Sequence, residues 1–364
     1  MIFFFSFIIL IIFLEIFLRL KKKPDLKYQN IKRIPPVNLS RIYEIYSKTG
    51  HSQNSEKSES LGWDLIENSH INVKINVPYF EETSVDYILN NTSARSNLKI
   101  FKNETNKNLI GYFGCSITYG YGLNNEETYA NKFFEQNKEY DYLNFAVPGY
   151  SAYQSLIKLK QKIKNTKFKK VVLGIHRDLE RRNTCAVSWT KIINNFWAIP
   201  FMINIFNINF EFKPKKRFDF KFFKLRVVNL LTEVFNIFIF SLGSIKKIQK
   251  NTMKEILINF KKICDENKIE LIVLCLEEYN EIYEFLNRNS FNWNTTNINL
   301  NETNEKGEFI WQLMPWDNHP NKDANNIFSE KLNEVIHSKQ RPFKPTKIKK
   351  IKKDSDQEYI YPLW

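Results

Sequence analysis

The alternation of short apolar runs with amphipathic stretches from residue 107 onward predicts the fold class. Strands are expected at four apolar runs, 108–113, 141–147, 170–175 and 270–276. Helices are expected where apolar residues recur at helical spacing, near 125–137, 151–164, 246–267, 278–287 and 323–337. Because repeated strand–helix units form parallel sheets with helices on both faces, we predict an α/β protein, a three-layer α/β/α sandwich with a central parallel sheet.

The first residues form a separate apolar segment. Residues 2–18 are apolar except for Ser6 and Glu15, and this length is at the short end of the roughly 17–25 residues that span a bilayer. No basic residue precedes the segment and no small-residue cleavage site follows it, so we expect an uncleaved membrane anchor, an N-terminal hydrophobic helix within residues 1–20. The basic residues that follow favour a cytoplasmic domain by the positive-inside rule. A buried apolar helix is the alternative.

Three more segments depart from the strand–helix alternation. Residues 21–106 form a polar extension in which the alternating stretch 71–77 predicts a strand that packs on the main domain, 107–340. Residues 184–244 interrupt that domain as an insertion rich in Phe, Ile and Trp. The insertion is a lid, a surface resting on a bilayer, or a second small core, and these alternatives stay open. The basic tail 341–364 contacts anionic lipid or is simply solvated.

Charge and cysteine content narrow the function classes. The chain has 364 residues and a formal net charge of +15. Its lysines are spread along the sequence and no nucleic-acid-binding motif accompanies them, so we expect a solvated basic surface and no nucleic-acid partner. The four cysteines form no C-x-x-C pair or His/Cys cluster, so neither a zinc site nor a disulfide framework is indicated.

Two short motifs supply candidate chemistry. The expected strand 108–113 breaks at Gly114-Cys115-Ser116 before a helical pattern, and such a turn exposes a hydroxyl at the carboxyl end of a central strand. Near the other end of the chain, Asp317 and His319 precede Pro320, which disfavours a helical conformation for His319 and predicts an extended loop. A serine nucleophile needs an imidazole base, and that base needs a carboxylate to orient it. Ser116, His319 and Asp317 are therefore a candidate catalytic triad.

The motifs resemble a known family when they are taken together. GCSITYG (114–120), NFAVPGYS (144–151) and DNHPN (317–321) are similar, in that order, to the first, second and last sequence blocks of the SGNH (GDSL-type) esterase family. The resemblance extends to a bacterial branch with an N-terminal anchor followed by a GW segment, here Gly62-Trp63. It implies an SGNH/flavodoxin-like fold and places the domain outside the inner membrane. The side of the membrane therefore stays open.

The resemblance also implies an oxyanion hole. Gly149 matches the family's backbone donor of the second block, beside the N–H of Ser116. In its third sequence block, after the third strand, the family commonly has G-x-N-D. This chain instead reads GIHRDLERRN from 174 to 183, with His176 where the Asn would be. We expect His176 to donate to the oxyanion, with Arg177, Arg182 and Asn183 as competing candidates, or to be merely hydrogen-bonded locally. Cys115 replaces the Asp of GDS and is interpreted as a buried thiol.

The sequence therefore predicts a membrane-anchored SGNH-type serine hydrolase that cleaves short-chain O-acyl esters, with relatives pointing to envelope polysaccharide. The mechanism requires no metal and no organic cofactor. An O-acyltransferase acting on glycans and a non-catalytic glycan-binding envelope protein are the two alternatives, and the altered third block supports the second. The oligomeric state is left open.

Overall fold

The computed structural model describes eight stretches of the chain: 55–75, 83–102, 108–190, 199–213, 238–239, 241–305, 307–314 and 317–337. The predicted anchor and the basic tail lie outside them. No helix within these stretches has the length and apolar character needed to cross a membrane.

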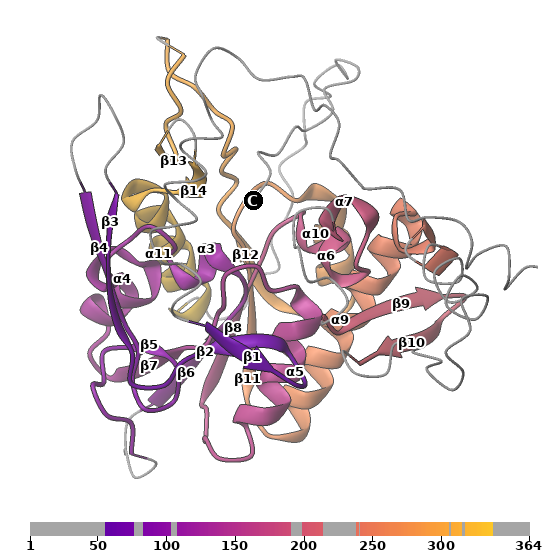
Figure 1. The fold of residues 1–364 in the computed structure, drawn as a ribbon, viewed down its shortest axis with the longest axis horizontal. Helices are drawn as coiled ribbons and strands as arrows, with labels where there is room; N and C mark the ends of the chain where they lie inside the picture. Colours follow the sequence, from indigo (N-terminus) through magenta and orange to yellow (C-terminus); the bar gives the residue numbers. More distant parts are fainter. Residues whose placement is uncertain are drawn as a thin grey trace, which may run out of the picture.

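The core of the molecule is a six-stranded sheet (Figure 1). Its strands, in spatial order, are β12 (Asn292–Thr295), β11 (Glu270–Cys275), β8 (Lys170–Ile175), β6 (Asn108–Phe113), β7 (Tyr140–Asn144) and β5 (Arg95–Ser96). The pairs from β12 to β7 are parallel, whereas β5 pairs with β7 in the antiparallel sense. The prediction of a central parallel sheet is confirmed for five strands, and the N-terminal extension supplies an antiparallel edge.

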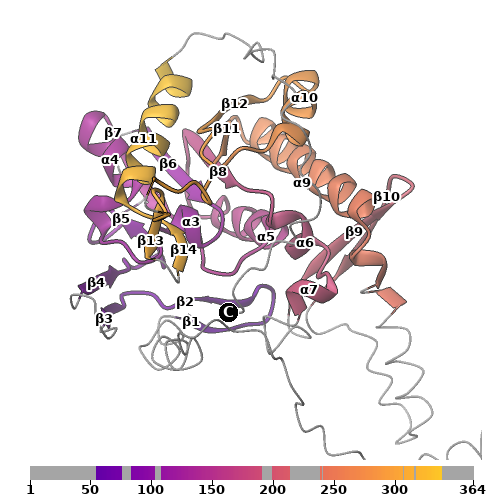
Figure 2. The same cartoon turned by 90° about the horizontal axis from the view of Figure 1, so that it is seen from above.

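Helices cover both faces of this sheet (Figure 2). One face carries α4 (Tyr129–Gln136), which follows the 3₁₀ turn η2 (Asn125–Glu127), and the C-terminal α11 (Lys322–His337), which packs on α4. The opposite face carries α5 (Ala152–Lys162) and α9 (Lys246–Glu266), which contact each other. The middle residues of β6, β7, β8 and β11 are buried between these layers, so the apolar runs of the sequence form one continuous core.

The N-terminal extension adds two antiparallel ladders beside the sheet. β1 (Ser55–Ser58) pairs with β2 (Gly62–Leu65), and β3 (His70–Ile75) pairs with β4 (Thr83–Ile88). Both lie along the side of the molecule that holds the short helix α3 (Ser116–Tyr119) (Figure 2). Their apolar residues form a second core together with residues of the first and second sequence blocks. The extension is thus part of the folded domain.

The remaining elements lie after β8 and around β12. After β8, α6 (Leu179–Asn183) precedes the insertion. Within the insertion, α7 (Val187–Thr190) is followed by an antiparallel hairpin of β9 (Phe201–Ile205) and β10 (Ile208–Phe212), which packs on α9. α10 (Asn280–Arg288) connects β11 to β12, and β13 (Gln312–Met314) pairs with β14 (Asp317–Pro320) just before α11. The segment predicted as an extended loop at Asp317 and His319 is therefore extended, but it is a strand of a small ladder.

Candidate functional site

The turn after β6 places Ser116 at the carboxyl end of a central strand. Gly114 has φ +153°, and a Cβ there would lie 2.4 Å from Thr118 Oγ1, so no side chain fits at this point of the turn. Helix α3 begins at Ser116 and ends at Tyr119. The residue after it, Gly120, adopts a left-handed conformation that lets its N–H bond to the carbonyl of Ile117. Ser116 is 6% exposed. Its backbone N–H is in the first turn of a helix, where N–H groups lack an intrahelical acceptor.

The segment after α3 connects this turn to His319. The N–H of Tyr121 donates to the carbonyl of Ser116 at 3.0 Å, and the Tyr121 ring packs on the His319 ring with centroids 4.3 Å apart and an interplanar angle of 30°. Strand β14, which carries His319, also contacts α3. The structure thus brings the serine block and the histidine block together, about two hundred residues apart in sequence. Asp317 is the first residue of β14, and its side chain lies outside the described part of the chain.

The second block forms a tight turn that is attached to the first. The N–H of Val147 donates to the carbonyl of Gly114 at 3.2 Å, and the N–H of Tyr150 closes the turn on the carbonyl of Val147 at 3.1 Å. Pro148 and Gly149 occupy the central positions, and Gly149 has φ +82°, as the third position of a type II turn requires. Gly149 is therefore held next to the turn of Ser116.

His176 follows β8, and its Nε2 lies 3.1 Å from the Sγ of Cys115. Both side chains are buried. Burial alone would raise the pKa of Cys115, but the charge and hydrogen bond of His176, together with the charge of Arg182, lower it to about 6. Burial likewise opposes the charged form of His176, but Cys115 raises the pKa of the imidazole above its usual value. The expectation that Cys115 is a buried thiol is correct as to burial, and the pairing with His176 favours its ionised form.

The other candidates of the third block have defined partners. Arg182 donates through Nε to Asp178 at 2.6 Å and through Nη1 to the carbonyl of Tyr150 at 3.4 Å, so it joins α6 to the Gly149 turn. Burial opposes ionisation of Asp178, but Arg182 and Arg181 lower its pKa to about 2. Asn183 accepts from the N–H of Tyr153 at 3.1 Å.

Arg177, the remaining candidate, donates through Nη2 to the carbonyl of Glu278 at 3.2 Å. These contacts place Arg182 nearer to the second block than Arg177. The role of His176 as an oxyanion donor stays a prediction.

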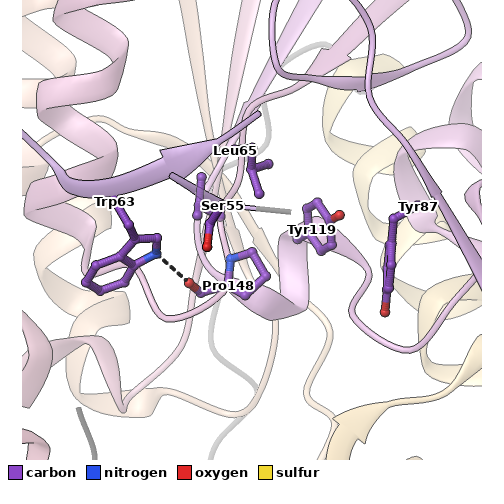
Figure 3. A pocket seen from close by; sticks show the side chains of 7 residues that line it. Ser55, Trp63, Leu65, Tyr87, Tyr119 and Pro148 are labelled. Carbon is purple, nitrogen blue, oxygen red and sulfur yellow. Dashed lines mark hydrogen bonds between the residues drawn. The ribbon is translucent and has the colours of Figure 1, made fainter. Parts of the chain in front are cut away.

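Trp63 of β2 contacts the Gly149 turn, a contact that sequence reasoning did not predict. Its indole N–H donates to the carbonyl of Pro148 at 3.2 Å (Figure 3), and a Cβ on Gly149 would lie 3.1 Å from its Cζ2. The hydroxyl of Tyr150 donates to the carbonyl of Trp63 at 2.6 Å. The GW segment was visible in the sequence, but only the folded structure shows that its Trp covers the turn.

Arg95 is a second residue whose position the sequence did not reveal. Its side chain is 1% exposed and lies against the rings of Tyr87 and Tyr119. The guanidinium donates to the carbonyls of Tyr119, Gly120 and Leu123 at 2.8–3.0 Å. It therefore fixes the segment that runs from α3 past Tyr121. Within the described ranges, no group of three or more His, Cys, Asp and Glu residues is arranged to hold a metal ion.

Comparison with known proteins gives matches in structure only. No family model matches the sequence, and no curated protein matches it. Similar solved structures include a GDSL-like lipase from Bacteroides thetaiotaomicron (11% identity, 65% of this chain, 91% of that chain, TM-score 0.36). A second is a member of the lipolytic G-D-S-L family from Veillonella parvula (11% identity, 62% of this chain, 97% of that chain, TM-score 0.37). A third is an acetylxylan esterase from Geobacillus stearothermophilus (11% identity, 65% of this chain, 97% of that chain, TM-score 0.35). The first two are G-D-S-L proteins, the class that the sequence motifs resemble.

Proposed function

We propose that this protein is a serine hydrolase of the SGNH type that cleaves O-acyl esters. The observation that supports this most is the convergence of three sequence blocks. The turn of Ser116 is joined to the Gly149 turn through the carbonyl of Gly114, and to His319 through Tyr121. A nucleophile, a base and a backbone donor close to one another are the minimum that acyl transfer to a serine requires.

In the proposed mechanism, Ser116 Oγ attacks the ester carbonyl while His319 takes its proton. The carbonyl oxygen becomes an oxyanion that accepts hydrogen bonds from the N–H groups of Ser116 and Gly149, with His176 as a third proposed donor. His319 then returns the proton to the leaving alcohol, and Asp317 orients the imidazole throughout. Water repeats the sequence on the acyl-enzyme and releases the acid. A glycan hydroxyl in place of water would make the same chemistry an acyl transfer.

The decisive test is covalent labelling of the nucleophile. A fluorophosphonate should label the wild-type protein and Cys115→Ala at Ser116, whereas Ser116→Ala should not react. His319→Ala should react far more slowly because the hydroxyl has lost its base. Labelling of Ser116→Ala at the wild-type rate would contradict the proposal, since the probe would then be reacting elsewhere.

The reaction products identify the substrate class. The protein should release free acid from short-chain aryl esters or from acetylated oligosaccharides. A mass gain on an added glycan would indicate an acyltransferase instead. A protein that turns over none of these esters, yet binds the oligosaccharide, would favour the glycan-binding alternative.

A further inference from the structure

A small cavity lies between the N-terminal ladders and the proposed catalytic blocks (Figure 3). Its volume is about 60 Å³. None of the residues around it carries a charge, and most present apolar or aromatic surface: Ser55, Trp63, Leu65, Tyr87, Tyr119, Val147 and Pro148. Because a water molecule needs about 15 Å³ of such volume, the cavity has room for about four non-hydrogen atoms.

Two walls of the cavity come from the elements that hold the proposed catalytic groups. Tyr119 is the last residue of α3, three positions after Ser116, and residues three apart in a helix share a face. Val147 and Pro148 directly precede Gly149 in the turn that is bonded to Gly114. A carbonyl held between the Ser116 hydroxyl and the Gly149 N–H would therefore have the cavity beside it.

The remaining walls come from the N-terminal extension and are held firmly. Trp63 is fixed to the Gly149 turn by its bond to Pro148 and by the bond that its own carbonyl accepts from Tyr150. Leu65, two residues further along β2, is 3% exposed. The extension thus supplies four of the seven residues around the cavity: Ser55, Trp63, Leu65 and Tyr87.

We propose that this cavity receives the acyl chain of the ester and limits it to short chains. The inference rests on the proposed function, because the carbonyl carbon must be attacked by Ser116. An uncharged wall excludes a charged acyl group, and a volume of about four non-hydrogen atoms accepts the carbons beyond the carbonyl in chains from acetyl to pentanoyl. Leu65 is then a residue that determines chain length, supplied by the extension and not by the core fold.

A series of p-nitrophenyl esters from acetate to octanoate tests this. The kcat/KM of the wild type should fall steeply beyond pentanoate. Leu65→Ala should raise the ratio of heptanoate to pentanoate activity about tenfold, because it opens room for two more methylene groups. The matched control is Leu61→Ala, which removes an equally buried leucine of the same second core that does not line the cavity. Equal chain-length profiles in Leu65→Ala and Leu61→Ala would overturn the proposal.

A binding measurement separates failure of the cavity from failure of the proposed function. With the leucine methyl groups isotopically labelled, butyramide should shift the Leu65 methyl resonances and leave those of Leu61 unchanged. This result together with no ester turnover would reject the esterase and keep the cavity as a site for short aliphatic chains. Unchanged Leu65 resonances at saturating butyramide would reject the cavity as an acyl site, whatever esters the protein hydrolyses.

Discussion

At the scale of single residues, the residue before the proposed nucleophile has unusual chemistry. Cys115 stands where the resembled family has Asp, and it faces His176 in a completely buried setting. A thiol buried without a partner would keep its proton, as Cys264 does, whose pKa burial raises to about 12. His176 and Arg182 reverse this tendency for Cys115. The contact with His176 therefore favours the ionised thiol next to Ser116, at the position where the resembled family has its aspartate.

This charge is measurable by thiolate absorbance near 240 nm. The difference between wild type and Cys115→Ala should show a thiolate that forms as the pH rises through about 6, because the folded protein holds the pKa of Cys115 near that value. In His176→Ala the transition should move to higher pH, since burial then outweighs the remaining charge of Arg182. A difference spectrum without any transition below pH 8 would contradict the pairing.

Tyr121 is a positioning residue for the proposed base. Its ring packs on His319, and its backbone is bonded to Ser116, so it sets the distance between the two blocks. Tyr121→Leu should lower kcat about 10- to 100-fold with little change in KM, because misplacing a catalytic group by about 1 Å costs this much. Tyr121→Phe keeps the ring and should retain most of the activity. Equal losses in both variants would mean that the hydroxyl, and not the ring packing, is what matters.

At the scale of elements, Arg95 shows how the short edge strand β5 supports the site. The guanidinium is buried, no carboxylate within the described residues pairs with it, and three backbone carbonyls accept its hydrogen bonds. Those carbonyls belong to the segment that carries Tyr121. An element from the extension thus holds in place the segment on which His319 packs.

Arg95→Lys tests this support. A lysine keeps the charge but cannot reach three carbonyls with one planar fork, so at least one carbonyl should lose its partner. Hydrogen bonds to charged groups are worth about 1.5–3 kcal/mol each, so the free energy of unfolding in urea should fall by at least about 2 kcal/mol. Arg288→Lys, at a highly exposed position, is the control and should change stability by less than about 0.5 kcal/mol. If Arg95→Lys is as stable as the wild type, the segment does not depend on the hydrogen bonds from the guanidinium.

The same elements show what the sequence could and could not predict. The strands β6, β8 and β11 and the helix α9 were predicted almost to the residue, because buried parallel strands and amphipathic helices leave strong periodic patterns. The positions of Trp63 and Arg95 were not predicted, because each depends on backbone atoms that lie 24 or more residues away along the chain. Every residue has a backbone carbonyl, so the sequence does not show which carbonyl accepts a given hydrogen bond. The Cys115–His176 pair was missed because periodicity does not show which side chains meet across two strands.

At the scale of the whole molecule, one buried ion pair joins the extension to the main domain. Lys158 of α5 is fully buried, and its Nζ lies 2.5 Å from the Oδ1 of Asp64 of β2. Burial lowers the pKa of Lys158 to about 8 against the opposing effect of Asp64. Gln154, one helical turn earlier, donates to the carbonyl of Leu61. Helix α5 thus holds the β1–β2 hairpin by a charged contact and a neutral one.

Breaking this ion pair should lower the free energy of unfolding, whereas replacing both of its residues by apolar ones should restore most of the loss. Asp64→Asn leaves a buried ammonium without its carboxylate and should lower the free energy of unfolding by about 3–5 kcal/mol. The double variant Asp64→Leu with Lys158→Met replaces both charges by apolar groups and should recover most of that loss. Urea denaturation of the two variants at pH 7 measures both values. If the double variant is less stable than Asp64→Asn, the attraction between the two charges stabilises the hairpin by more than burying them costs.

The sequence distance between the hairpin and its partners has a consequence for synthesis on the ribosome. Leu61, Trp63 and Asp64 bond to residues 85 to 94 positions later in the chain. At a translation rate of about 5–20 residues per second, those partners appear roughly 5–20 seconds after the hairpin itself. During that interval the hairpin can pack on the β3–β4 ladder, which shares its core, but not yet on the second block or on helix α5. We therefore expect the nascent hairpin to stay loosely held until residues up to about 160 have been made.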